Sequence, residues 1–183
     1  MMQRWLMLSI LMLLVATAAD AQEALDFKGV KLGALYSEFN VPGGRWSCQP
    51  FKRTLSDQVC SQRDNFKETI AGRPVQGITL FFYDERLATI IVAFHPDDFD
   101  TVVQALNARY GKAAKQDAVL VRSRAGVEYK NDRIIWKPLP DTITTERYGD
   151  SLERTTVQFT SGWGDSISSK RIAEQKLKAA KDL

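Results

Sequence analysis

Two runs of β-branched and aromatic residues, 75–83 and 87–94, give the clearest pattern along the chain. Only the short polar segment Asp84-Glu85-Arg86 separates them, as in a β-hairpin. The runs are apolar at nearly every position around 80–82 and 90–94, which is typical of strands in the middle of a sheet. The pattern therefore predicts a β-hairpin in the middle of a sheet.

The segment that follows predicts an α-helix over about 98–110. Its apolar residues recur at helical spacing, namely Phe99, Val102, Val103, Leu106 and Tyr110. Gly111 comes next, where a helix C-terminus favours a residue that tolerates positive φ. We expect this amphipathic helix to be the one main helix and to pack against the sheet.

The remaining segments complete an α+β fold with an antiparallel sheet. Alternating residues predict further strands at 118–122, 126–136, 141–148 and 154–160. The segment that contains the two cysteines, 45–66, is polar and predicts a loop or an irregular hairpin. A short helix is expected at 34–40. A helical segment followed by strands thus occurs twice, and two helix-plus-sheet units are a further hypothesis.

The first 21 residues have the pattern of a secretory signal peptide. Arg4 precedes an apolar run from Leu6 to Ala16, and Ala19-Asp20-Ala21 fits the small-x-small cleavage pattern. The alternative is an uncleaved anchor, but the run is shorter than the roughly 20 residues that span a bilayer. We therefore predict a periplasmic or secreted protein with one domain at 22–165 and no integral membrane segment after cleavage.

Cys48 and Cys60 are the two cysteines of the chain, and both lie in the part expected to be exported. In an oxidising compartment such a pair usually forms a disulfide. Redox motifs favour a C-x-x-C spacing, and a zinc site needs more cysteine or histidine ligands than a chain with one histidine offers. We predict a structural disulfide and no cofactor.

Several motifs resemble those of a group of small, mostly uncharacterised proteins that Gram-negative bacteria export. They are FKGVKLG at 27–33, the two cysteines, TIAGRPV at 69–75, FFYDERL at 81–87 and FDTVVQALNARYGK at 99–112. The group has an F-x-G-V-x-L-G opening, an F-x-x-V-x-x-A-L-x-x-x-Y-G helix and a later β region with Gly and Trp, for which Gly126 and Trp136 are suitably placed. The resemblance implies a periplasmic α+β domain and supplies no catalytic residues.

His95, Asp97, Asp98 and Asp100 form the one polar cluster that could act as a metal or acid–base site. The aspartates also fall at the start of the predicted helix, where free N–H groups and the helix dipole favour carboxylates. Asp97 as N-cap with Asp100 near N3, or the same pattern shifted by one residue, explains the cluster without a ligand. We predict helix capping, and no metal or catalytic residue.

The tail, 166–183, is basic and has a thin apolar face, which predicts a marginal, solvated helix. Together with Trp163, which glycines flank, Lys170 and Arg171 give a possible contact surface. The net charge of +3 is too small to demand a nucleic-acid partner.

No serine lies in a G-x-S-x-G motif, the signature of one large class of hydrolases. We therefore expect a non-enzymatic binding or accessory module of the periplasm, with a protein or an envelope component as partner. The alternatives are a hydrolase that acts on cell-envelope material and a structural envelope protein held by the basic tail.

Overall fold

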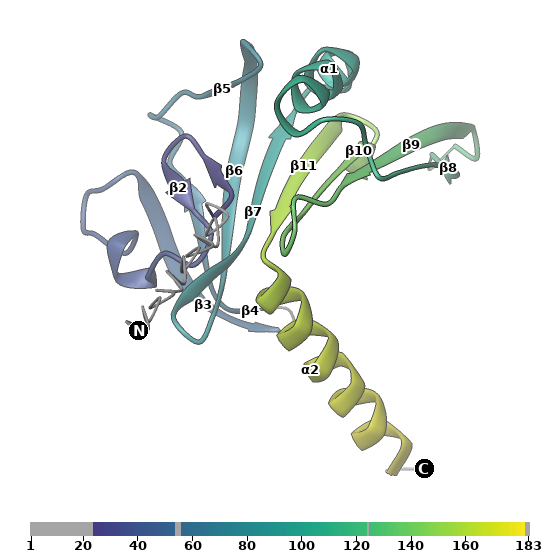
Figure 1. The fold of residues 1–183 in the computed structure, drawn as a ribbon. Coiled ribbons are helices and arrows are strands. Elements are labelled where there is room, and N and C mark those ends of the chain that lie inside the picture. The colour runs from purple at the N-terminus through teal and green to yellow at the C-terminus, as the bar shows by residue number, and fades with distance from the viewer. Residues whose placement is uncertain (1–23, 54–55, 124, 182–183) are drawn as a thin grey trace, which may run out of the picture.

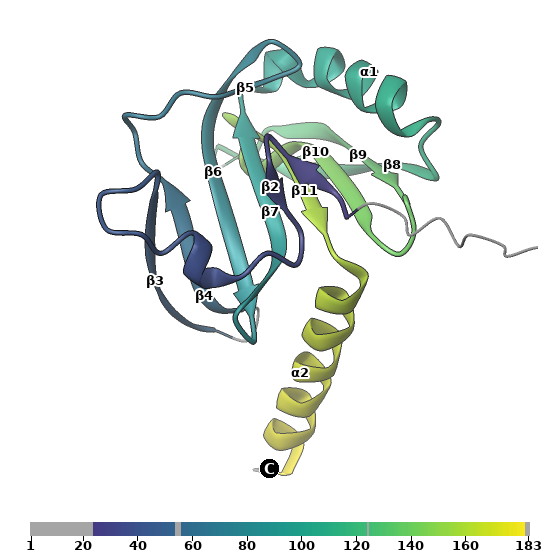
Figure 2. The ribbon, with the colours of Figure 1, turned by 60° about the vertical axis from the view of Figure 1, so that its left-hand side comes forward.

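The computed structural model describes residues 24–53, 56–123 and 125–181, so the predicted signal peptide lies outside the described residues. An antiparallel sheet runs in the order β3-β4-β6-β7-β11-β10-β9-β8 (Figures 1 and 2). Its strands are β3 (Trp46–Arg53), β4 (Ser56–Gln62), β6 (Arg73–Tyr83), β7 (Arg86–Phe94), β8 (Lys115–Arg122), β9 (Glu128–Trp136), β10 (Thr142–Ser151) and β11 (Arg154–Thr160). The two-residue strand β5 (Thr69–Ile70) pairs with β6 off this path.

The predicted central hairpin is confirmed as β6 and β7. Its two turn residues, Asp84 and Glu85, have φ of 45° and 64°. Positive φ at both positions gives a turn whose twist matches that of the flanking strands, which explains how two residues suffice to reverse the chain. The core-facing side chains of the hairpin are fully buried, as predicted for central strands: Ile78, Leu80, Phe82, Leu87, Ile90, Val92 and Phe94.

The sheet consists of two runs of strands that meet in its middle. The first run is β3, β4, β6 and β7, and the second is β8 to β11. They join where β7 pairs with β11, with Val92 opposite Val157 and Ile90 opposite Phe159. The predicted strands of the second run are confirmed with shifted bounds, since β8 begins at Lys115 and β10 extends to Ser151.

The helix predicted after the central hairpin is confirmed as α1 (Phe99–Tyr110). Phe99, Val102 and Leu106 are buried in the same core cluster as the strands. The indole N–H of Trp136 on β9 is within hydrogen-bond distance of Asn107 Oδ1, at 3.1 Å, and of the carbonyl of residue 111, at 3.2 Å. A polar contact thus reinforces the packing of α1 on this part of the sheet.

The N-terminal segment covers the same side of the sheet with little regular structure. It contains β1 (Asp26–Phe27), β2 (Val30–Lys31) and a 3-10 turn at Tyr36–Glu38, where a short helix over 34–40 was expected. Its buried apolar residues join the core cluster: Leu25, Phe27, Val30, Leu32 and Phe39.

A second helix, α2 (Gly162–Lys181), is longer than α1 and extends away from the sheet (Figure 1). The expectation of one main helix is therefore not confirmed, although the tail is helical as predicted. α2 begins at Gly162, directly after β11. It therefore starts inside the domain that was predicted to end at residue 165, and it is not confined to the tail. Within the described residues, no helix has the length and apolar character needed to cross a membrane.

The segment around the cysteines forms the antiparallel strands β3 and β4, whose pairing has a register shift between Pro50 and Arg53, as in the irregular hairpin that was one of the two expectations. Cys48 lies directly opposite Cys60, with a Cα–Cα distance of 4.0 Å, and the two form the predicted disulfide. Such a bond is compatible with export to an oxidising compartment.

Candidate functional site on the open face of the sheet

One face of the sheet packs against the core, and the other, the open face, is only partly covered. Along β11, Val157 and Phe159 are buried in the core, whereas Thr156 and Gln158 point the opposite way and are half-buried. The alternation follows from the two-residue period of a strand. The open face is therefore the part of the sheet that the core leaves available.

A hollow of about 460 Å³ lies on the open face. Residues of β4, β6, β7, β10 and β11 line it: Ser61, Gln62, Gly77, Ile78, Thr79, Phe81, Ile91, Ala93, Thr144, Glu146, Gly149, Asp150, Arg154, Thr156 and Gln158. A smaller hollow of about 180 Å³ continues to the first turns of α2 and shares Phe81, Ile91 and Gln158 with the larger one. We call the two together the open-face groove.

The floor of the groove combines apolar and hydroxyl-bearing side chains. Phe81 and Ile91 are half-buried in its middle. The ring of Phe51 meets Phe81 edge to face, with centroids 5.8 Å apart. Gln158 Nε2 donates to the hydroxyl of Thr160 at 3.0 Å. Such a floor offers both apolar contact and hydrogen bonds to a bound chain.

Ion pairs occupy one end of the groove. Glu146 forms an ion pair with Arg133 at 3.2 Å, and Asp150 forms one with Arg154 at 3.1 Å. These four charges compensate one another, so that the β10 end of the groove is close to neutral. A bound segment would meet no large uncompensated charge there.

Asp165 of α2 lies at the other end of the groove and has no ion pair with any described residue. Burial raises the pKa of its carboxyl group, and the nearby negative charge of Asp141 raises this pKa further. Asp141 itself is buried and accepts from the backbone N–H of Gly162 at 3.2 Å. The α2 end of the groove is thus acidic.

Arg171 fixes the middle of α2 to the sheet. Its guanidinium donates to both carboxylate oxygens of Asp57 on β4, at 2.7 and 3.2 Å, and lies 3.6 Å from Asp84. It also stacks over the ring of Tyr83, 4.9 Å from the centroid. The hydrogen bonds from Arg171 lower the pKa of Asp57, and those to Asp57 raise the pKa of Arg171.

Two glycines allow the start of α2 to lie close to its neighbours. A Cβ at residue 162 would lie 2.5 Å from the carbonyl oxygen of Pro140. A Cβ at residue 164 would lie 2.8 Å from the Cβ of Ala88 on β7. Gly164 also receives a side-chain cap, because its N–H donates to Ser161 Oγ at 3.1 Å. The glycines beside Trp163 therefore serve close packing.

The three residues expected to form a contact surface all lie on α2 but differ in environment. Trp163 is half-buried, Lys170 is exposed, and Arg171 is engaged with Asp57. Beyond Arg171, the described side chains up to Lys178 are exposed, as expected for a solvated tail. Arg171 is thus part of the attachment of α2.

The cluster around His95 does not cap α1 as predicted. Asp98 occupies the N-cap position, within one residue of the expected one, but its carboxylate makes no capping hydrogen bond and lies 3.4 Å from Arg73. The capping group is His95, whose Nδ1 accepts from the backbone N–H of Asp97 at 3.3 Å in the 3-10 turn Pro96–Asp98. The prediction failed because this additional turn places Asp97 and Asp98 before the first turn of α1.

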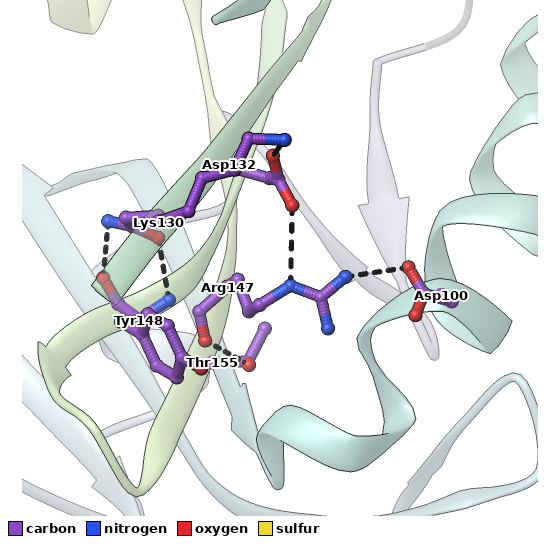
Figure 3. Close-up of polar contacts among 7 residues, drawn as sticks. Asp100, Lys130, Asp132, Arg147, Tyr148 and Thr155 are labelled. Carbon is purple, nitrogen blue, oxygen red and sulfur yellow. Dashed lines mark hydrogen bonds and ion pairs between the residues drawn. The ribbon is translucent and has the colours of Figure 1, made fainter. Parts of the chain in front are cut away.

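The fourth residue of that cluster, Asp100, belongs to a polar network around Arg147 (Figure 3). Arg147 Nη2 donates to Asp100 at 2.8 Å, and its Nε lies 3.4 Å from Asp132 on β9. The guanidinium also stacks on the ring of Phe99, 4.3 Å from the centroid, while the carbonyl of Arg147 accepts from the hydroxyl of Thr155. The network joins the start of α1 to the sheet, so the role of Asp100 in this structure is to hold the helix in place.

Within the described residues, no group of three or more His, Cys, Asp or Glu side chains converges as metal ligands would. No protein-family model, no curated protein and no solved structure matches the chain. The open-face groove is therefore identified as the candidate site from its geometry alone. Sequence reasoning did not identify the residues of this groove, because its threonines and Gln158 are ordinary residues for a solvated strand face.

Proposed function

We propose that the protein is a non-enzymatic binding module of the bacterial periplasm, and that it binds a polypeptide segment of a partner in the open-face groove. The observation that carries this proposal is the continuous groove across the middle of the sheet, with Phe81 and Ile91 in its floor. The resemblance to small exported proteins and the disulfide support the location.

The composition of the groove supports a polypeptide as the occupant. An extended chain presents apolar side chains and backbone polar groups side by side, and the floor offers Phe81 and Ile91 next to the threonine hydroxyls. The carboxylates at the β10 end are held in ion pairs, an arrangement that suits binding better than proton transfer.

Site-specific photo-crosslinking in periplasm tests this proposal. A photoreactive residue at Thr79 or Thr156, both in the groove floor, should give a discrete crosslinked product, whereas the same residue at exposed Ala108 on α1 should not. Mass spectrometry of the product must identify a polypeptide. Crosslinking with equal yield from all three positions, or none from the groove, would contradict the proposal.

The hydrolase remains an alternative because Asp165 combines a raised pKa with a place in the groove. A general acid acts best when its pKa lies close to the working pH. The test is whether the purified protein degrades envelope polymers and whether Asp165→Asn abolishes this activity while circular dichroism shows an unchanged fold. If both hold, the hydrolase replaces the binding proposal.

The exposed part of α2 supports the alternative of a structural envelope protein. Lys170, Lys176 and Lys178 are exposed on it. Deletion of 172–183, which leaves the Arg171 attachment in place, should then release the protein from the membrane fraction. Under the binding proposal the same deletion leaves the fractionation unchanged.

We also propose that the sheet consists of two related helix-plus-sheet units. The order of the strands supports this, since each run of neighbouring strands follows a helical segment: the 3-10 turn at Tyr36–Glu38 and α1. In the second unit, α1 would pack on the strands β8 to β11 through Phe99, Val102 and Leu106.

A further inference from the structure

The two edges of the sheet differ in how they are protected. β3 carries Pro50 within the strand, which lacks a backbone N–H, and a register shift follows between Pro50 and Arg53. Both features are common ways to prevent an edge from pairing with another strand. β8, at the opposite edge, has neither proline nor glycine over Lys115–Arg122 and pairs with β9 in an uninterrupted register.

Apolar side chains on the hairpin of β8 and β9 are exposed. Val119 is 50% and Leu120 69% exposed, and Val127 and Tyr129 are also exposed. Val119 and Leu120 are neighbours in a strand and so lie on opposite faces of the sheet. The edge is therefore apolar on both faces, and its outward backbone groups have no strand beside them in the described chain (Figure 1).

The charges near this edge are neutralised within the hairpin. Lys115 lies 2.6 Å from Asp117 on the same strand, and Arg122 pairs with Glu128 on β9. Edge strands commonly carry unpaired charges that repel another strand. In β8 each charged residue already has a partner of opposite sign, so this form of protection is weak.

We propose that β8 pairs with β8 of a second copy, which joins the two sheets into one across a two-fold axis at Val119. Residues that face each other in an antiparallel pair lie on the same side of the sheet, so a two-fold axis must pass through a residue position. With the axis at Val119, this residue faces its own counterpart and Ala118 faces Leu120. Asp117 then faces Val121, and no two like charges are directly opposite.

A second copy suits this edge because the strand is complementary to itself. The register at Val119 overlaps nearly all of β8, and it places Val119 opposite Val119 on one face and Ala118 opposite Leu120 on the other. It also covers Val119 and Leu120 in both copies at once. The groove lies over β4, β6, β7, β10 and β11 and stays open in such a dimer, so the inference is independent of the proposed function.

Light scattering after gel filtration, with the disulfide-bonded mature protein, tests the proposal. The wild type should have twice the mass of one chain at high protein concentration. Val119→Lys and Val119→Glu should each raise the dissociation constant more than about tenfold, because two like charges then face each other at the axis. An equimolar mixture of the two variants should restore the dimer, since opposite charges now meet there.

Val41 provides a matched control, because it is 51% exposed and lies far from β8 in the sequence and outside the sheet. Val41→Lys should leave the mass of the dimer unchanged. A wild type that is monomeric at all concentrations overturns the proposal, as does a dimer that Val119→Lys does not weaken. Failure of the mixture to restore the dimer overturns the register at Val119, and circular dichroism of each variant separates loss of pairing from loss of fold.

Discussion

Arg171 on α2 holds Asp57 on β4 by two hydrogen bonds, although the two residues are 114 positions apart in the sequence. α1 and α2 lie at opposite ends of the sheet (Figure 1), and the pair, with Tyr83, attaches α2 at its end. Beyond this point the described side chains of the helix are exposed. The position of α2 therefore depends largely on this contact and on the packing of its first turn.

Asp57→Asn should loosen α2 without unfolding the sheet. The pair is partly exposed, with side-chain exposures of 38% and 29%, so its loss should cost less than about 1 kcal/mol of global stability. Hydrogen exchange measured by mass spectrometry should show faster exchange in α2 and unchanged exchange in β6 and β7. Lys170→Gln, which changes the exposed neighbour of Arg171, should leave both rates unchanged, and equal effects of the two variants would contradict the prediction.

Acid should release α2 in the same way. Hydrogen bonds from Arg171 lower the pKa of Asp57 below its ordinary value of 3.8. A carboxyl group whose pKa is lower in the folded state stabilises that state above its unfolded pKa and loses this effect as the pH falls through the folded pKa. The protection of α2, that is, its exchange corrected for the intrinsic rate at each pH, should therefore fall below about pH 4 in the wild type. In Asp57→Asn this acid-dependent loss of protection should be absent. If it persists in the variant, another titrating group causes it.

Gly164→Ala should destabilise the protein, although alanine favours helices over glycine by about 1 kcal/mol. The added Cβ would lie 2.8 Å from Ala88 Cβ and 2.7 Å from Ser161 Oγ, which forces α2 away from β7. We expect a loss of about 1–3 kcal/mol in the free energy of unfolding by urea. Gly77→Ala is the control, because a Cβ there meets no atom within 4 Å, and it should not destabilise the protein.

Tyr110→Phe should stabilise the protein or leave it unchanged. The hydroxyl of Tyr110 at the end of α1 is buried and has no hydrogen-bond partner among the described residues, and burial raises its pKa. Removal of an unsatisfied buried hydroxyl avoids its desolvation cost, which is about 1–3 kcal/mol. The midpoint of urea unfolding should rise or stay constant. A clear fall would show that the hydroxyl has a partner in solution, and Tyr129→Phe on an exposed tyrosine controls for the loss of a hydroxyl as such.

Local patterns in the sequence predicted the parts of the fold that local interactions determine. The hairpin of β6 and β7 follows from two apolar runs and a two-residue turn, and α1 follows from the spacing of Phe99, Val102 and Leu106. The disulfide followed from the two cysteines and the expected compartment. Each of these inferences needed only neighbouring residues or a single pair.

The remaining features depend on contacts between distant segments. Nothing near Arg171 in the sequence indicates Asp57 as its partner, and the thin apolar face of the tail predicted a weaker attachment than the ion pair provides. The capping of the turn by His95 was missed because a 3-10 turn before a helix has no strong sequence signal. The groove requires the order of the strands, which alternation within each strand does not reveal.

The pairing of β7 with β11 in the middle of the sheet also determines when the fold can be completed. β11 ends at Thr160, more than sixty positions after β7 ends at Phe94, and only then do the two runs of strands join. Until this strand is available, a growing chain has one side of its most apolar strand unpaired. The slowest stage of assembly should therefore be the closing of this long loop, and an emerging chain is most prone to aggregate before it closes.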